Sequence, residues 1–142
     1  MMILFICHEN LNRSPRAAEV FRRLADQKGF DVEIQSAGIN APSYFSPKIL
    51  SMAFGVNHVT KLTDEMLEKA DVAVALDDWV QQKIETDYGV KPKRIVTLGI
   101  PDHYSLIQNN LSKLYKILDE KLEPLAEEIS LSQRRRPNKE IL

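Results

Sequence analysis

Four short apolar segments alternate with helix-forming segments along this chain, and no other sequence feature constrains the fold as strongly. Residues 2–6 form a continuous apolar run, which is typical of a strand buried on both faces. Further strands are predicted at residues 32–36, 71–76 and 94–98. Strands that alternate with helices form parallel sheets. The sequence therefore predicts an α/β three-layer sandwich, with a four-stranded parallel sheet and helices on both faces.

Capping residues and glycines mark the expected helix boundaries. Ser14 and Pro15 indicate the beginning of a helix, because serine caps well and proline is tolerated at the first helical position. Gly29 is a typical helix stop. Further helices are expected over residues 47–54, from Thr63 and over residues 78–88. Trp79 and Tyr88 are interpreted as packing residues of the last of these helices.

The last expected helix begins near Ser105 and carries one apolar face. Its leucines and isoleucines follow each other at helical spacings of three and four residues up to Ile129. Pro124 is expected to kink or interrupt this helix. The length of the chain suits one domain, predicted at residues 1–129. Residues 130–142 form a basic C-terminal tail without a periodic face, which is expected to be flexible.

Composition excludes several classes of function. A single cysteine leaves no internal disulfide framework and no multi-cysteine zinc site, and the three histidines lack metal-ligand spacing. Basic and acidic residues nearly balance, and the basic tail leaves the rest acidic, so nucleic-acid binding is not expected. The apolar runs are too short to span a membrane. The first residues lack a basic leader, and a cytoplasmic location is expected.

The loop after the first strand places Cys7 and Arg13 with five residues between them, directly before a helix. Backbone N–H groups in such a loop can form a nest for an oxyanion, which the helix dipole reinforces. The guanidinium of Arg13 can grip two phosphate oxygens, and it favours the thiolate of Cys7. The loop thus predicts a nucleophile inside a cradle for the group it attacks. The expected phosphate-binding residues are His8, Glu9, Asn10, Leu11, Asn12 and Arg13.

A simpler interpretation of this loop is purely structural. Cys7 could be a buried core thiol and Arg13 a solvated charge at the helix start, since a lone cysteine is usually buried. The spacing alone is weak evidence. The preceding strand, the Ser14–Pro15 pair and the following helix favour the phosphate loop.

Residues 3–15 read Ile-Leu-Phe-Ile-Cys-His-Glu-Asn-Leu-Asn-Arg-Ser-Pro. They resemble the signature of the low-molecular-weight protein tyrosine phosphatases, in which Cys, two residues, Asn, two residues and Arg-Ser-Pro follow an apolar strand. Residues 35–38, 55–66 and 100–104 are similar to later segments of that family, in the same order. The resemblance covers about residues 2–125 and implies the family's phosphotyrosine phosphatase I-like fold.

The resemblance implies a two-step phosphoryl transfer through a cysteinyl-phosphate. Cys7 would attack phosphorus, Arg13 would bind the equatorial oxygens, and Asn10 would help to hold the cradle. The hydroxyl of Ser14 would stabilise the sulfur as a leaving group, although Ser14 also fits a plain helix cap. No metal or other cofactor is expected, because Arg13 and the backbone dipoles supply the positive field.

Asp102 is the expected general acid and base. It follows the fourth strand at the predicted edge and matches the acid in the family's Asp-Pro-Tyr loop, although an aspartate beside a proline is also an ordinary turn residue. Asp77 and Asp78 follow the third strand at the same edge. They rank lower, because aspartate there more often starts the next helix.

Three positions depart from the family pattern, and three aromatic residues are candidates for the substrate wall. Glu9 stands where many members have glycine, Asn12 where many have a second cysteine, and His103 where the family has proline. A carboxylate at position 9 suits an anion site only if it points outward. The candidate walls for an aryl group are Tyr44, Phe45 and Tyr104, with local packing as an equal alternative for the first two.

The leading functional interpretation is a metal-independent phosphomonoesterase, a protein tyrosine phosphatase whose partner is a phosphotyrosine protein or a small aryl phosphate. Two alternatives stay open. An arsenate reductase would need an external thiol, because Cys7 is the only cysteine. A non-catalytic phosphate-binding or regulatory module would account for Glu9 and His103.

Overall fold

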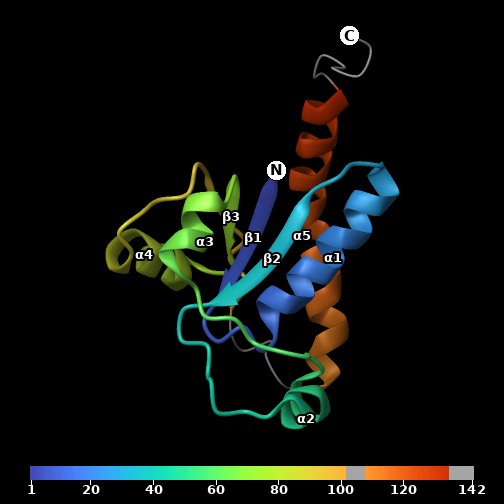
Figure 1. Cartoon of the computed structure of the whole chain (residues 1–142). Coiled ribbons are helices and arrows are strands. Elements are labelled where there is room, and N and C mark those ends of the chain that lie inside the picture. Colours follow the sequence, from blue (N-terminus) through green and yellow to red (C-terminus); the bar gives the residue numbers. More distant parts are fainter. Residues whose placement is uncertain (102–107, 135–142) are drawn as a thin grey trace.

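The computed structural model describes residues 1–101 and 108–134 and contains a parallel sheet with helices on both faces (Figure 1). The strands are β1 (Met2–Cys7), β2 (Glu33–Gly38), β3 (Val72–Ala75) and β4 (Ile95–Thr97). They form a four-stranded sheet in the order β2-β1-β3-β4, and every neighbouring pair is parallel. The predicted α/β three-layer architecture is therefore confirmed.

The helices begin and end close to the residues that the caps indicate. They are α1 (Arg13–Lys28), α2 (Pro47–Ile49) with the π-helical turn η1 (Leu50–Phe54), α3 (Asp64–Lys69), α4 (Asp78–Asp87) and α5 (Gln108–Arg134). Gly29 and Gly55 end α1 and η1 with φ angles of 72° and 70°, a backbone conformation that glycine adopts without strain. Thr63 caps α3 by accepting a hydrogen bond from the N–H of Met66.

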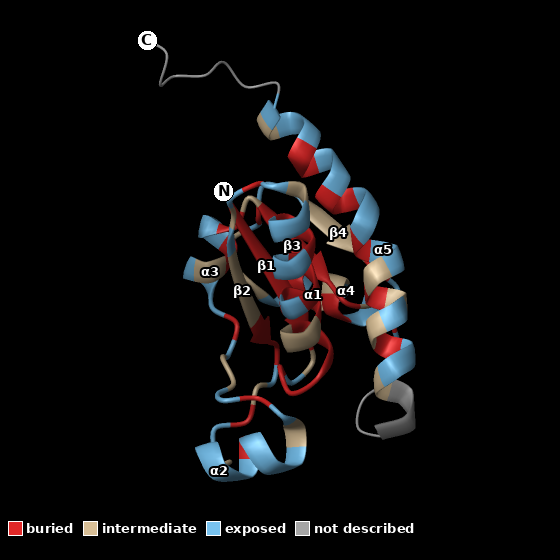
Figure 2. Ribbon diagram, turned by 90° about the vertical axis from the view of Figure 1, so that its right-hand side faces the viewer, coloured by how far each residue is buried: buried red, intermediate tan, exposed pale blue. Residues whose placement is uncertain are grey.

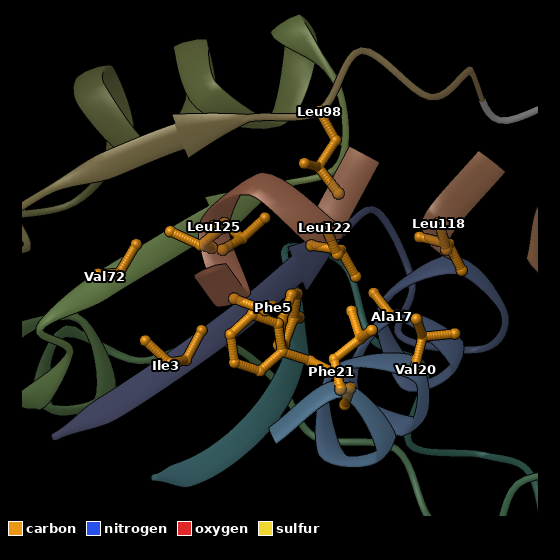
Figure 3. Close-up of a cluster of buried hydrophobic side chains, with 14 of the residues drawn as sticks. Ile3, Phe5, Ala17, Val20, Phe21, Val72, Leu98, Leu118, Leu122 and Leu125 are labelled. Carbon is orange, nitrogen blue, oxygen red and sulfur yellow. The ribbon is translucent and has the colours of Figure 1, made fainter. Parts of the chain in front are cut away.

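Each face of the sheet has its own apolar core. Alternate residues of β1 point to opposite sides, so Ile3 and Phe5 pack with α1 and α5, whereas Leu4 and Ile6 pack with α3 and α4. Figure 3 shows the first of these cores, in which the ring of Phe5 lies beside Phe21 of α1. Because β1 is buried on both faces, its C-terminal end is held firmly in the middle of the molecule.

Helix α5 is longer and more continuous than expected. It passes through Pro124 without a break. Proline has no N–H to donate to the carbonyl one turn earlier, but Pro124 lies on the exposed side of the helix, where that carbonyl can bind water. The tail predicted to be flexible from residue 130 is helical up to Arg134, since Ile129 and Ser130 are buried and Gln133 donates a hydrogen bond to the carbonyl of Asp31. None of the described helices is both long and apolar enough to cross a membrane.

Strand β2 lies further along the chain than the predicted segment 32–36. Its residues pair with β1 from Met2 opposite Glu33 to Cys7 opposite Gly38. The alternation of residue types could not reveal this, because parallel pairing with β1 fixes the register. As a result, β2 reaches the start of the loop that follows Cys7.

The α2 segment, which consists of α2 and η1, lies apart from the sheet and is largely exposed (Figure 2).

Candidate active site

The predicted phosphate loop lies at the carboxyl end of β1. Cys7 is the last residue of that strand, and α1 begins at Arg13, so the loop turns directly from a buried strand into a helix. Ligands in open parallel sheets bind at this edge. The backbone carbonyl of Cys7 accepts a hydrogen bond from the N–H of Ile39 at 3.0 Å, which ties the start of the loop to the chain after β2.

The sulfur of Cys7 lies among hydrogen-bond donors. The N–H of Asn10 donates to Sγ at 3.2 Å, and Oγ of Ser14 lies 3.0 Å from Sγ. The Ser14 hydroxyl already accepts a hydrogen bond from Nδ2 of Asn10 at 2.8 Å, so its own hydrogen is available to the sulfur or to the more distant carbonyl of Ala37 at 3.4 Å. Both contacts suit a thiolate better than a neutral thiol. Cys7 is buried, as the core-thiol interpretation expects, but that interpretation does not explain these two contacts.

Asn10 fixes the curvature of the loop. Its φ angle is 60°, the left-handed conformation that asparagine adopts more readily than most residues. Besides Ser14, its Nδ2 donates to Oγ of Ser36 at 3.0 Å, and its Oδ1 accepts from the N–H of Thr60 at 2.8 Å. The Asn10 side chain thus joins the loop to β2 and to the segment before α3. This supports the cradle-holding role that the sequence predicts for it.

Gly38 lies against the back of the loop. A Cβ atom at this position would lie 2.6 Å from the backbone nitrogen of Asn10 and 2.6 Å from the carbonyl carbon of Glu9. The backbone of Gly38 also bonds to the segment before α3 on both sides, through the carbonyl of Thr60 and the N–H of Leu62. Only glycine permits this close approach of β2 to the loop.

Arg13 is 1% exposed and is anchored to the ends of β3 and β4. Its Nη1 donates to Oδ2 of Asp77 at 2.7 Å and to the carbonyl oxygen of Ile100 at 2.7 Å. The other carboxylate oxygen of Asp77 caps α4 by accepting from the N–H of Val80 at 2.9 Å. The sequence interpretation that Asp77 starts the next helix is confirmed, and its contact with Arg13 is an additional finding.

The remaining loop residues differ in their surroundings. Glu9 is exposed, which is the orientation that an anion site requires of a carboxylate at this position. Leu11 is buried in a small apolar cluster with Leu50 and Val56, so it joins the loop to the α2 segment. Asn12 is buried and stands at the N-cap position of α1.

Two of the three predicted wall residues are described by the structure, and they contact each other. The rings of Tyr44 and Phe45 lie 4.6 Å apart between centroids, and Phe45 packs on Phe54 at 5.3 Å. Tyr44 is 78% exposed, whereas Phe45 belongs partly to the apolar cluster beneath the loop. Tyr44 therefore exposes an aromatic face to solvent, and Phe45 packs against it.

Asp102, the predicted acid, lies outside the described residues, as do His103 and Tyr104. Of the competing carboxylates, Asp77 has both oxygens occupied, and Asp78 is exposed in the first turn of α4. No group of three His, Cys, Asp or Glu side chains among the residues that the structure describes could hold a metal ion.

The sequence did not identify three residues that contact the phosphate loop, which are Ser36, Thr60 and Trp79. Ser36 and Thr60 hold the Asn10 side chain, but each lies far from the loop in sequence, and only folding brings them to it. Trp79, interpreted as a packing residue of its helix, packs on the phosphate loop and not in the apolar core. Its ring lies 4.8 Å from that of His8, and 39% of the residue is exposed. An exposed tryptophan at the start of a helix has no periodic signal that separates it from a core residue.

Comparison with known proteins agrees with this geometry. The family described as low molecular weight phosphotyrosine protein phosphatase matches residues 2–135. A protein-arginine-phosphatase of Bacillus subtilis is 30% identical over 105 residues, which are 69% of this chain and 70% of that protein. The solution structure of a low molecular weight protein tyrosine phosphatase from Bacillus subtilis superposes with a TM-score of 0.73 at 28% identity, covering 96% of this chain and 100% of that chain.

A more distant structure has the same fold. The tyrosine phosphatase Wzb from Escherichia coli K30, in complex with phosphate, superposes with a TM-score of 0.70 at 22% identity and covers 89% of this chain and 96% of that chain. The family match over nearly the whole chain agrees with the buried loop that holds a cysteine beside an arginine. This chain belongs to the low molecular weight phosphotyrosine protein phosphatase family and is a cysteine-based phosphatase.

Proposed function

We propose that this protein hydrolyses phosphotyrosine in proteins, and small aryl phosphates, through a cysteinyl-phosphate intermediate. The observation that carries the proposal is the position of the Cys7 sulfur, 3.2 Å from the N–H of Asn10 and 3.0 Å from Oγ of Ser14. Donors that stabilise a thiolate in the resting enzyme also stabilise it as the leaving group of the second step. The anchored guanidinium of Arg13 at the same edge supports a role as the phosphate clamp.

In the first step, the thiolate of Cys7 attacks phosphorus and a P–S bond forms. The bond between phosphorus and the aryl oxygen breaks, and the leaving oxygen takes a proton from Asp102. Arg13 and the loop N–H groups bind the equatorial oxygens, where negative charge is concentrated. We assign the acid role to Asp102 because both carboxylate oxygens of Asp77 already accept hydrogen bonds from Arg13 and from the N–H of Val80.

In the second step, the Asp102 carboxylate removes a proton from water, and the water oxygen attacks phosphorus. The P–S bond breaks, inorganic phosphate leaves, and Cys7 returns as a thiolate that Ser14 and the N–H of Asn10 stabilise. The cycle needs a reduced Cys7, which supports the expectation of a reducing compartment such as the cytoplasm.

The substitution Cys7→Ser tests this function on a chromogenic aryl phosphate. We expect turnover to disappear, because a serine hydroxyl is a far weaker nucleophile and an alkoxide a poorer leaving group than a thiolate. Circular dichroism and thermal unfolding show whether the variant keeps its fold. Turnover that persists in a folded Cys7→Ser variant would refute the mechanism.

A second candidate substrate is phosphoarginine in proteins. The similarity to a protein-arginine-phosphatase and the exposed carboxylate of Glu9 in the loop favour it, because a guanidinium substrate would attract a carboxylate at the mouth of the site. Ratios of kcat/KM for phosphotyrosine and phosphoarginine peptides of the same sequence decide between the two. The aromatic face of Tyr44 leads us to expect the higher value for phosphotyrosine, and Glu9→Gln would lower only the value for phosphoarginine.

A further inference from the structure

An exposed aromatic side chain lies against the residue that follows the nucleophile. Trp79 in the first turn of α4 contacts His8, with ring centroids 4.8 Å apart and ring planes tilted by 57°. His8 is half-buried, and 39% of Trp79 faces solvent. We refer to these two rings as the His8–Trp79 ledge. The exposed part of the indole is an apolar surface beside the catalytic loop, available to a bound substrate.

The ledge is fixed in position on both sides. On the helix side, Asp77 caps α4 and bonds to Arg13 at 2.7 Å, so the first turn of α4 is tied to the phosphate loop. On the loop side, the carbonyl of His8 accepts from the N–H of Asn40 at 2.7 Å, and the His8 ring nitrogen Nε2 lies 2.9 Å from Nδ2 of Asn40. A surface held in this way is preorganised for binding.

The charges around the ledge favour an apolar occupant over an acidic one. Nζ of Lys83 lies 5.7 Å from the centre of the Trp79 ring, but Asp87 is 3.6 Å from the same nitrogen and offsets its charge. Glu9 and Asp78, the chain neighbours of the two ledge residues, are exposed carboxylates that repel an acidic side chain. The indole face therefore remains the main attractive feature of this surface.

We propose that the His8–Trp79 ledge is a subsite that binds an aromatic or aliphatic side chain two positions from the phosphorylated residue of a protein substrate. The proposal rests on the proposed function, because it takes the phosphate to lie at Cys7. Side chains of an extended peptide alternate in direction, so the residue two positions from the phosphorylated one, about 7 Å along the backbone, points to the same side and can reach the ring of the residue that follows Cys7. The ledge thus gives this phosphatase a preference for sequence around the phosphorylated position.

Three phosphotyrosine peptides test the subsite through kcat/KM, and they differ only in the residues two positions before and after the phosphotyrosine, which are Phe, Gly or Asp. We expect the Phe peptide to exceed the Gly peptide by about tenfold, which corresponds to about 1.4 kcal/mol. Trp79→Ala should bring this ratio close to one, and Trp79→Phe should retain most of it. Gln82→Ala, an exposed substitution further along the same helix, is the matched control and should keep the parent ratio.

Trp79 is the only tryptophan of the chain, so its fluorescence reports on the ledge without any turnover. In the Cys7→Ser variant, the Phe peptide should change the emission at lower concentrations than the Gly peptide, and free phosphotyrosine should change it least. An equal response to the Phe, Gly and Asp peptides, or no response to any of them, would overturn the subsite. If the proposed function itself were wrong, the result would be different, because the parent enzyme would then fail to turn over free phosphotyrosine.

Discussion

At the scale of single residues, Asn10 links the nucleophile to the rest of the fold. Its amide side chain bonds to Ser14, Ser36 and the backbone of Thr60, and its own N–H points at the Cys7 sulfur. Removing a buried side chain with several hydrogen bonds leaves its partners unsatisfied. The geometry of the loop therefore depends on the side chain of a residue whose backbone N–H contacts the nucleophile.

We expect Asn10→Ala to lower both stability and activity. Ser36 and Thr60 would lose a buried partner and alanine would be strained at a φ of 60°, which together lower the free energy of unfolding by about 2 to 3 kcal/mol. The value of kcat/KM should fall at least tenfold. Urea unfolding and aryl phosphate kinetics measure both effects. Asn57→Ala, at an exposed position, serves as control, and an Asn10→Ala enzyme as active as this control would contradict the linking role.

Asp77 has two separable roles, as a helix cap and as the anchor of Arg13. Asp77→Ala removes both and should lower the free energy of unfolding by about 1 kcal/mol through the lost cap. Asp77→Ser keeps a capping hydroxyl but still removes the carboxylate partner of the buried Arg13, so its stability should lie between those of Asp77→Ala and the parent. Both variants should raise KM for aryl phosphates, because Arg13 loses its carboxylate partner. A normal KM in Asp77→Ser would show that Arg13 needs no such anchor.

At this scale, the sequence identifies residues of the site only where they lie close together in the chain. Cys7, Asn10, Arg13 and Ser14 lie close together in the sequence, and their spacing predicts the phosphate loop together with the preceding strand and the following helix. Ser36, Thr60 and Asp77 reach the same site from three other segments. Their contacts depend on the register of strands that local patterns do not encode.

At the scale of secondary-structure elements, the site depends on how closely β2 approaches the phosphate loop. Gly38 pairs with Cys7 at the end of both strands, and its Cα hydrogen faces the loop backbone where any other residue would place a side chain. Gly38→Ala therefore has to move either β2 or the loop.

We expect Gly38→Ala to lower the free energy of unfolding by about 2 kcal/mol and kcat/KM by at least tenfold. Gly89→Ala provides the comparison, because its new Cβ would meet nothing nearer than Oδ2 of Asp64 at 3.5 Å. The comparison variant should keep the activity of the parent. Thermal unfolding and aryl phosphate kinetics on both proteins give the result, and equal activity in the two variants would show that the loop tolerates displacement.

Helix boundaries were predictable because caps act locally, as Thr63 and Gly55 illustrate. The two larger errors concern tertiary contacts. Residues 130–134 lack a periodic face of their own, yet buried contacts at Ile129 and Ser130 extend α5 to Arg134. Pro124 does not break the helix because it happens to face solvent, which the sequence does not reveal.

At the scale of the whole molecule, ionic contacts join the start of β1 to the start of β3. The Asp71 carboxylate accepts a hydrogen bond from the N–H of Met2 at 2.7 Å and another from Nζ of Lys93 at 3.1 Å. The pKa of Asp71 lies below its usual value of 3.8. The larger cause is the backbone hydrogen bond from Met2, and the hydrogen bond from Lys93 lowers the pKa further. A carboxylate with a lowered folded-state pKa stabilises the fold above its unfolded-state pKa and loses that contribution as the pH falls further.

We expect Asp71→Asn to lower the free energy of unfolding by about 1 kcal/mol at neutral pH. The difference from the parent should persist down to about pH 3.8 and shrink below it, as Asp71 of the parent becomes protonated. Urea unfolding of both proteins between about pH 2.5 and 7 measures this difference, with Asp26→Asn as an exposed control in α1. A difference that grows as the pH falls would contradict the assigned contacts.

The overall architecture was the most predictable level of organisation. Alternating strands and helices leave few topologies, and continuous apolar runs such as β1 and β3 identify the central strands of the sheet. The edge strand β2 is half exposed, and its bounds were misplaced by two residues at the carboxyl end, where it matters for the site.

Transfer of a phosphoryl group to Cys7 is the step from which the proposed activity follows, and it can be observed directly. The enzyme is mixed with an aryl phosphate, quenched before the first turnover is complete, and digested for mass spectrometry. We predict one phosphoryl group on the peptide that contains Cys7, and none on that peptide from a Cys7→Ala control. Turnover by the parent enzyme without phosphate on Cys7, or with phosphate on another side chain, would contradict the account.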